Sequence, residues 1–277
     1  MISSDSLLEF GFPVTESNRT AEIIDGKKQL AFAAATTGEL TLVDWHSLAG
    51  IAQPFSSLSH YLGAVLFLTL SFFLLRNAQR TGGFWSYVIF ACSAVLLLTV
   101  SGTAHLFSPG SPARKILFRL DLVAIFLLIA GTFTPIHWVL FHGWRRWSVL
   151  ILIWSMAATG ILARLFFMDS IPYAVGTGIF VAMGWVGLFS GVLVRLQYGP
   201  GYLGPLLAGG ICYTAGAVMD ACQWPTPLPM IIGPHELFHL MVLAGLAFQW
   251  YFIAQIAAGR IPSRGDALGE RHPQPND

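Results

Sequence analysis

Long apolar stretches, separated by short polar links, follow one another from about residue 56 to residue 256. Each stretch is close to the length of about 20 residues that an α-helix needs to cross the hydrocarbon core of a bilayer. The pattern predicts an all-α fold: a polytopic membrane protein built as a seven-transmembrane helix bundle. The predicted spans are residues 56–75, 84–107, 117–141, 147–167, 172–194, 203–222 and 234–256.

The links between the predicted helices are short and contain turn-forming residues, as in Ser108-Pro109-Gly110-Ser111-Pro112. Links of this length force consecutive helices to run antiparallel. The starts of the first, third, fifth and seventh helices therefore share one membrane face with the ends of the second, fourth and sixth helices.

The segments that flank the helices divide the chain into three parts. Residues 1–52 scatter acidic side chains among short apolar runs, and we expect a soluble or interfacial N-terminal extension without a cleaved signal peptide. Residues 53–257 form the predicted transmembrane domain. Residues 258–277 form a polar C-terminal tail with several prolines.

Composition supports the membrane prediction and narrows the choice of partners. Apolar residues make up 55% of the chain and charged residues 10%, which excludes a soluble globular protein. The net charge of +1, without a basic run, gives no reason to expect a nucleic-acid partner. We expect an integral, multi-pass protein of the cell membrane whose partners are membrane lipids, including a lipid substrate.

The last apolar segment opens with a pair of histidines. Pro234 suits the first position of a helix, and the helix that follows places His235 and His239 one turn apart on the same face. Buried polar groups in a bilayer need partners, so two adjacent imidazoles are more informative than one. The pair is half of a zinc site, or two packed histidines.

Three other polar residues fall on the same membrane face. His105 ends the second predicted helix, Ser101 lies one turn before it, and Asp121 begins the third helix. With His235 and His239, His105 completes a three-histidine set with an open fourth position, as in catalytic zinc sites. Asp121 would then accept a hydrogen bond from a water at the metal or act on it as a base.

These residues also have simpler interpretations. Asp121 is also explained as an acid that the helix dipole favours in a first turn, or as a partner of Arg119 or Arg114. Ser101 is also explained by a hydrogen bond back to a helix carbonyl. His60 lies on the correct face, yet a structural or interfacial role is favoured for it. Asp220 is expected to be solvated, and His137 to be interfacial at the opposite face.

The chain resembles the PAQR and hemolysin III group, seven-helix proteins that include the adiponectin and progestin receptors. The resemblance covers about residues 53–257. It rests on Ser57-Leu58-Ser59-His60 with Leu62-Gly63-Ala64, Ser101 to His105, Arg119-Leu120-Asp121 with Ala130 to Pro135, Gly209 to Ala217, and His235 to His239.

The resemblance implies a zinc site close to one membrane face. Carried over residue by residue, it falls on Ser101, His105, Asp121, His235 and His239. It also implies a lipid amide hydrolase of ceramidase type, or a receptor built on the same fold.

The chain departs from the family pattern at two positions. The family often has an acidic residue and an Asn shortly before the histidine of the first helix, where this chain has Gln53 and Ser56. The orientation of the protein in the membrane stays open. The arginines that flank the helices favour a metal site on the outer side, whereas the receptors of the family have their metal site facing the cytosol.

We therefore expect a zinc-dependent intramembrane hydrolase. The metal would be held by His105, His235 and His239, with Asp121 as the base and Ser101 orienting the water or stabilising the oxyanion. One alternative is a membrane receptor or signalling protein with a structural zinc site. A second is an HExxH metalloprotease, in which Glu236 would be the base.

Overall fold

The computed structural model describes residues 51–78, 83–167, 173–228 and 232–261, all within one compact unit that comprises residues 48–277. The described residues form seven helices long and apolar enough to cross a membrane, which confirms the predicted all-α bundle. The helices are α2 (Pro54–Ala78), α3 (Phe84–Ala104), α4 (Pro112–Leu140), α5 (Trp144–Phe167), α6 (Tyr173–Tyr198), α7 (Leu203–Cys222) and α8 (Pro234–Ala257), with a short 3-10 helix, η3 (Pro200–Tyr202), before α7.

The largest difference from the predicted helix limits is at the start of α4. The predicted span begins at residue 117, but the helix begins at Pro112. The Ser111 side chain caps it by accepting a hydrogen bond from the Arg114 backbone N–H at 3.3 Å, and proline is well suited to the first helical position. The extra turns bring Arg114 onto the helix, close to the end of α3.

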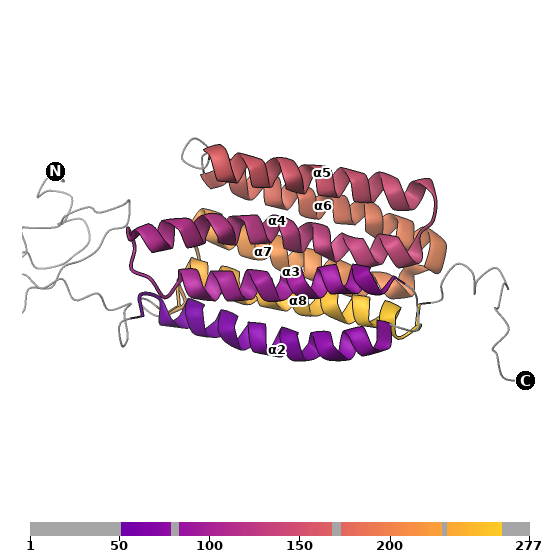
Figure 1. The fold of residues 1–277 in the computed structure, drawn as a ribbon, viewed down its shortest axis with the longest axis horizontal. Coiled ribbons are helices and arrows are strands. Elements are labelled where there is room, and N and C mark those ends of the chain that lie inside the picture. Colours follow the sequence, from indigo (N-terminus) through magenta and orange to yellow (C-terminus); the bar gives the residue numbers. More distant parts are fainter. Residues whose placement is uncertain (1–50, 79–82, 168–172, 229–231, 262–277) are drawn as a thin grey trace, which may run out of the picture. The chain divides into compact units, whose positions relative to one another are not determined.

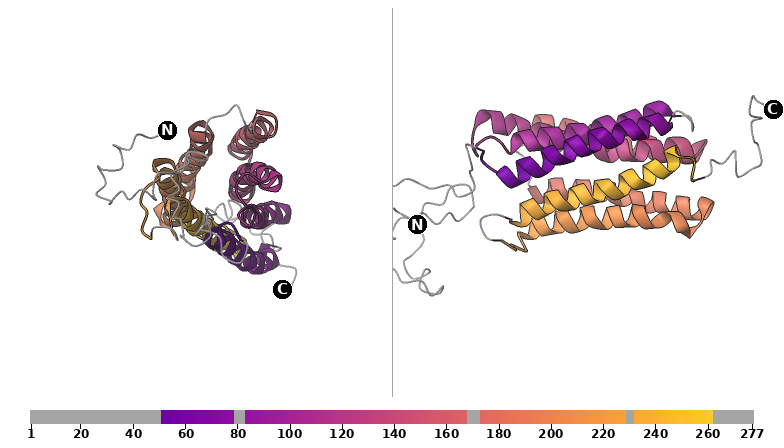
Figure 2. Two further views of the ribbon diagram at one scale, coloured as in Figure 1. Left: turned by 90° about the vertical axis from the view of Figure 1, so that its left-hand side faces the viewer. Right: turned by 90° about the horizontal axis from the view of Figure 1, so that it is seen from below.

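The helices form two layers (Figures 1 and 2). The helices α3, α4 and α5 lie side by side in one layer, and α6, α7 and α8 lie in the other. Helix α2 packs against both α3 and α8 and closes the bundle at one edge. This arrangement places the end of α3 beside the starts of α2 and α8, although these elements are far apart in the sequence.

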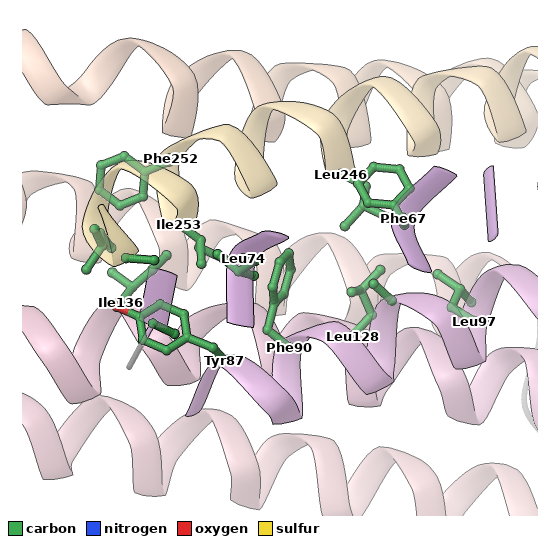
Figure 3. Packing of buried hydrophobic residues seen from close by; sticks show 14 of the residues in the cluster. Phe67, Leu74, Tyr87, Phe90, Leu97, Leu128, Ile136, Leu246, Phe252 and Ile253 are labelled. Atoms are coloured by element: carbon green, nitrogen blue, oxygen red, sulfur yellow. The ribbon is translucent and has the colours of Figure 1, made fainter. Parts of the chain in front are cut away.

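The hydrophobic core lies where α2, α3, α4 and α8 meet. Phe67 of α2, Phe90 of α3, Leu128 of α4 and Leu246 of α8 belong to one buried cluster, which Figure 3 shows from close by. The outward surface of α2 is equally apolar, with Leu62 62% exposed. Apolar side chains on the outside of a bundle suit a hydrocarbon environment.

Two of the predicted domains fall mostly outside the described residues. Residues 1–50 of the predicted N-terminal extension and residues 262–277 of the predicted tail lie outside them. The limits of both parts stay predictions.

Candidate metal centre

Three imidazole rings meet at the end of the bundle where α3 finishes and α8 begins. His105 follows the last residue of α3, and His235 and His239 lie in the first two turns of α8. One ring nitrogen from each of the three lies within 4.8 Å of the other two. His105 and His239 are almost fully buried, at 0% and 2% exposed. The structure thus brings together the three histidines that the sequence singled out.

The start of α8 fixes the direction of the His235 and His239 side chains. Gly233 precedes the helix, and its backbone N–H donates to Glu236 Oε2 at 3.0 Å, which is half of a capping box. The other carboxylate oxygen, Glu236 Oε1, accepts a hydrogen bond from Ser56 Oγ at 3.1 Å. Glu236 therefore joins α8 to α2, and both of its oxygens are occupied in doing so.

Hydrogen bonds at the Nδ1 atoms orient the two rings of α8. His239 Nδ1 lies 2.6 Å from His60 Nε2, and His235 Nδ1 lies 3.1 Å from Asp220 Oδ1. A carboxylate accepts only, so His235 carries its proton on Nδ1. The Nε2 atoms of His235 and His239 face each other at 3.0 Å.

The third ring is held by a residue from the segment before α2. Gln53 Oε1 accepts a hydrogen bond from His105 Nδ1 at 2.5 Å and a second from Arg114 Nη2 at 2.6 Å. Arginine only donates, so the Gln53 atom is the amide oxygen, and His105 must then carry its proton on Nδ1. The backbone N–H of Gln53 donates to the His105 carbonyl at 3.1 Å, which fixes the two residues against each other.

This hydrogen-bond pattern fits a metal ion. The Nδ1 atom of each ring contacts an outer partner, which leaves Nε2 as the nitrogen for a metal ion, and this is how histidine ligands are usually held. Three imidazole nitrogens suit zinc as well as other late first-row metals. His105, His235 and His239 can thus hold a metal ion, and their assignment as zinc ligands stays a prediction.

Asp121 and Ser101 lie near this cluster on α4 and α3. Ser101 Oγ donates to Asp121 Oδ2 at 3.3 Å, and both side chains are buried. Asp121 Oδ1 is buried and has no hydrogen-bond partner among the described residues. Asp121 also lines the same cavity as His235. The structure therefore pairs Ser101 with the carboxylate and leaves one carboxylate oxygen available.

The structure bears on three expectations about neighbouring residues. Asp220 is predicted to be solvated, but it is 4% exposed and bonded to His235. His60, for which a structural or interfacial role is favoured, is 2% exposed and contacts His239, which agrees with a structural role rather than an interfacial one. His137 is not an interfacial side chain, because it is fully buried and bonded through Nε2 to Ser190 Oγ at 2.8 Å.

The sequence alone does not single out Gln53 as part of the candidate site. In the sequence it is only a departure from the family pattern, yet in the structure it contacts both His105 and Arg114. The available signal was weak: a polar residue just ahead of the first apolar segment, on the predicted site face.

A large cavity leads from the cluster into the bundle. Its volume is about 840 Å³, within the usual range for small-molecule sites. Asp121, Asp220 and His235 line one part, and Ile136 lines another. Asp121 and Ile136 are 15 residues apart on α4, so the cavity runs for about 22 Å along that helix. Most of its lining is apolar, including Leu128, Phe180 and Leu206, contributed by α4, α6 and α7.

The contact between Gln53 and His105 allows a specific test. The change Gln53→Met removes the acceptor while keeping the length of the side chain, and we expect it to weaken metal binding by about 10- to 100-fold, since outer partners orient ligands. Competition with a fluorescent chelator would measure the affinity. Gln53→Glu keeps an acceptor oxygen and is expected to remain close to the wild type. Equal affinity of Gln53→Met and wild type would show that the contact does not support the ligand.

The fold and the cluster together define a seven-helix membrane protein with a buried histidine site at one end of the bundle. A family model described as "Haemolysin-III related" matches residues 51–250, and the chain belongs to this family.

Similar proteins agree with this assignment. The chain is 32% identical over 206 residues to "Hemolysin-3" of Bacillus cereus, covering 72% of this chain and 88% of that protein. It is 27% identical over 201 residues to "Hemolysin-3 homolog" of Bacillus subtilis (strain 168), covering 72% and 91%. It is 22% identical over 224 residues to "Adiponectin receptor protein" of Drosophila melanogaster, covering 73% of this chain but only 50% of that protein.

Proposed function

We propose that this protein is a zinc-dependent intramembrane hydrolase that acts on a lipid amide. The observation that carries the proposal is the junction of the cluster and the cavity: His235, a member of the three-histidine set, lines an apolar cavity together with Asp121. The three-histidine cluster, a carboxylate and an apolar cavity thus adjoin one another.

The residues support a division of roles. When bound at His105, His235 and His239, zinc would supply a Lewis acid for the amide carbonyl and make a water molecule more acidic. Asp121 Oδ1, without a partner among the described residues, would accept a proton from the attacking water. Ser101, which donates to Oδ2, would hold the carboxylate in place.

Transfer of this proton from Asp121 to the leaving amine completes the reaction. The water oxygen forms a bond to the carbonyl carbon, and Asp121 passes the proton to the amide nitrogen as the carbon–nitrogen bond breaks. The products are a carboxylic acid and an amine. The length of the cavity suits a lipid acyl group as substrate. The cavity runs for about 22 Å along α4, whereas a lipid chain that spans half of a bilayer core is roughly 15 Å long.

A second candidate function is that of a receptor in which the metal is structural. It is favoured by the names of matched relatives, such as "Adiponectin receptor protein" of Drosophila melanogaster. The three-ligand set supports catalysis instead, because structural zinc sites are usually closed by four protein ligands. The protease reading of HExxH gains no support, since Ser56 and Gly233 occupy both oxygens of Glu236.

The proposal is tested by lipid-amide hydrolysis. We expect zinc-loaded protein in phospholipid nanodiscs to release fatty acid from an N-acyl sphingosine, measured by chromatography. A chelator should abolish the release, and added zinc should restore it. If the zinc-loaded, folded protein cleaved neither N-acyl sphingosines nor N-acyl ethanolamines, this would contradict the proposed hydrolase and leave the receptor as the remaining candidate function.

A further inference from the structure

Two polar side chains deep in the cavity present hydrogen-bonding atoms that have no partner among the described residues. The hydroxyl of Tyr213 on α7 and the amide oxygen of Gln249 on α8 are both buried and unpaired, and both residues line the cavity. Gln249 is only 8% exposed, and its amide nitrogen is anchored on the Leu206 carbonyl at 3.5 Å. The amide therefore keeps its oxygen available. The unpaired Trp250 Nε1 does not line the cavity and has no part in this arrangement.

The packing of α7 on α8 places these two side chains at neighbouring levels of one helix interface. A Cβ atom at Gly209 would lie 2.7 Å from Gln249 Nε2, and one at Gly245 would lie 2.7 Å from Tyr213 Cε1. Each polar side chain thus packs on a glycine of the opposite helix. Gly209 and Tyr213 are four residues apart, as are Gly245 and Gln249, so Tyr213 and Gln249 differ in depth by about one helical turn, or about 6 Å.

The depth of this pair can be measured along the helices from the metal centre. Gln249 is ten residues beyond His239 on α8, which corresponds to about 15 Å. Tyr213 is seven residues before Asp220 on α7, which corresponds to about 10 Å. A lipid chain whose head lies at the histidine cluster would pass this pair in its distal half. Unpaired polar groups at such a depth are costly and call for a partner.

We propose that Tyr213 and Gln249 form a subsite for a hydroxyl group in the middle or distal part of a lipid chain. A hydroxyl can accept a hydrogen bond from the Tyr213 phenol and can donate one to Gln249 Oε1, so it matches the chemistry of both groups. A carbonyl or ether oxygen could satisfy only the phenol, and a plain alkyl chain neither. The subsite rests on the proposed function in one respect, which is that the cavity takes the lipid chain.

Ricinoleic and oleic acids form a matched pair of probes, because they differ by one mid-chain hydroxyl. Each would displace a fluorescent fatty acid from the full-length protein in detergent. We expect the wild type to bind ricinoleic acid about tenfold more tightly than oleic acid, the effect of two added hydrogen bonds in a buried site. Alpha-hydroxyoleic acid, with its hydroxyl beside the carboxyl group, should show no such gain.

Variants separate the subsite from differences in detergent partitioning. The Tyr213→Phe and Gln249→Leu changes should each reduce the preference for ricinoleic acid, and the double variant should abolish it while still binding oleic acid. Equal affinity of the wild type for the two acids, with oleic acid bound, would overturn the subsite and leave the proposed function intact. If neither acid displaced the fluorescent probe, the lipid-chain cavity of the proposed function would fail as well.

Discussion

Replacing His239 by Ala is expected to remove the metal from the protein while leaving the bundle folded. His239 is buried, contributes one of the three converging nitrogens and contacts His60 on its outer side. Loss of an outer partner of a metal ligand commonly weakens binding by 10- to 100-fold, and loss of the ligand itself should exceed about 100-fold. The wild type is expected to hold one zinc per chain, and His239→Ala almost none.

The measurement is metal content of the detergent-purified protein by mass spectrometry, after zinc loading and removal of excess ion. His142→Ala is the matched control, because His142 is exposed at the end of the bundle away from the cluster. This variant should keep its metal. A cooperative thermal transition in both variants would show that each is folded. Retention of one zinc per chain in His239→Ala would place the metal elsewhere.

The second expected result is that Asp121→Asn slows turnover severely without releasing the metal. Asp121 is not one of the three clustered residues, so the metal content should stay at the wild-type level. A general base typically contributes about 10²- to 10⁴-fold to the rate, and Asn cannot take up the proton. We therefore expect kcat for N-acyl sphingosine hydrolysis to fall by about that factor, with metal affinity nearly unchanged.

Glu236→Gln provides the contrast for this test. Glu236 is also an acid near the cluster, but its oxygens are engaged by Ser56 and Gly233. We expect this variant to retain turnover within a few-fold of the wild type, with some loss of stability where α8 begins. The reverse result, an active Asp121→Asn and an inactive Glu236→Gln, would assign the base to Glu236 and revive the protease reading.

The sequence by itself determined the helices and the membrane face of the site. A span of about 20 apolar residues has few alternatives in a bilayer, so the seven helices follow from local composition. Helical periodicity puts His235 and His239 on one face, and short links force the antiparallel order that brings His105 to the same depth. Depth and face are local properties, which is why they can be read from one chain.

Only the tertiary structure decided how the helices rotate and pack against one another. The partner of His239 is His60, 179 residues away, and the partner of His105 is Gln53, 52 residues away. Such pairs depend on lateral contacts between helices, which hydrophobic periodicity alone cannot specify. The same holds for Asp220, whose burial depends on α7 packing against α8, and for the cavity, which exists only between assembled helices.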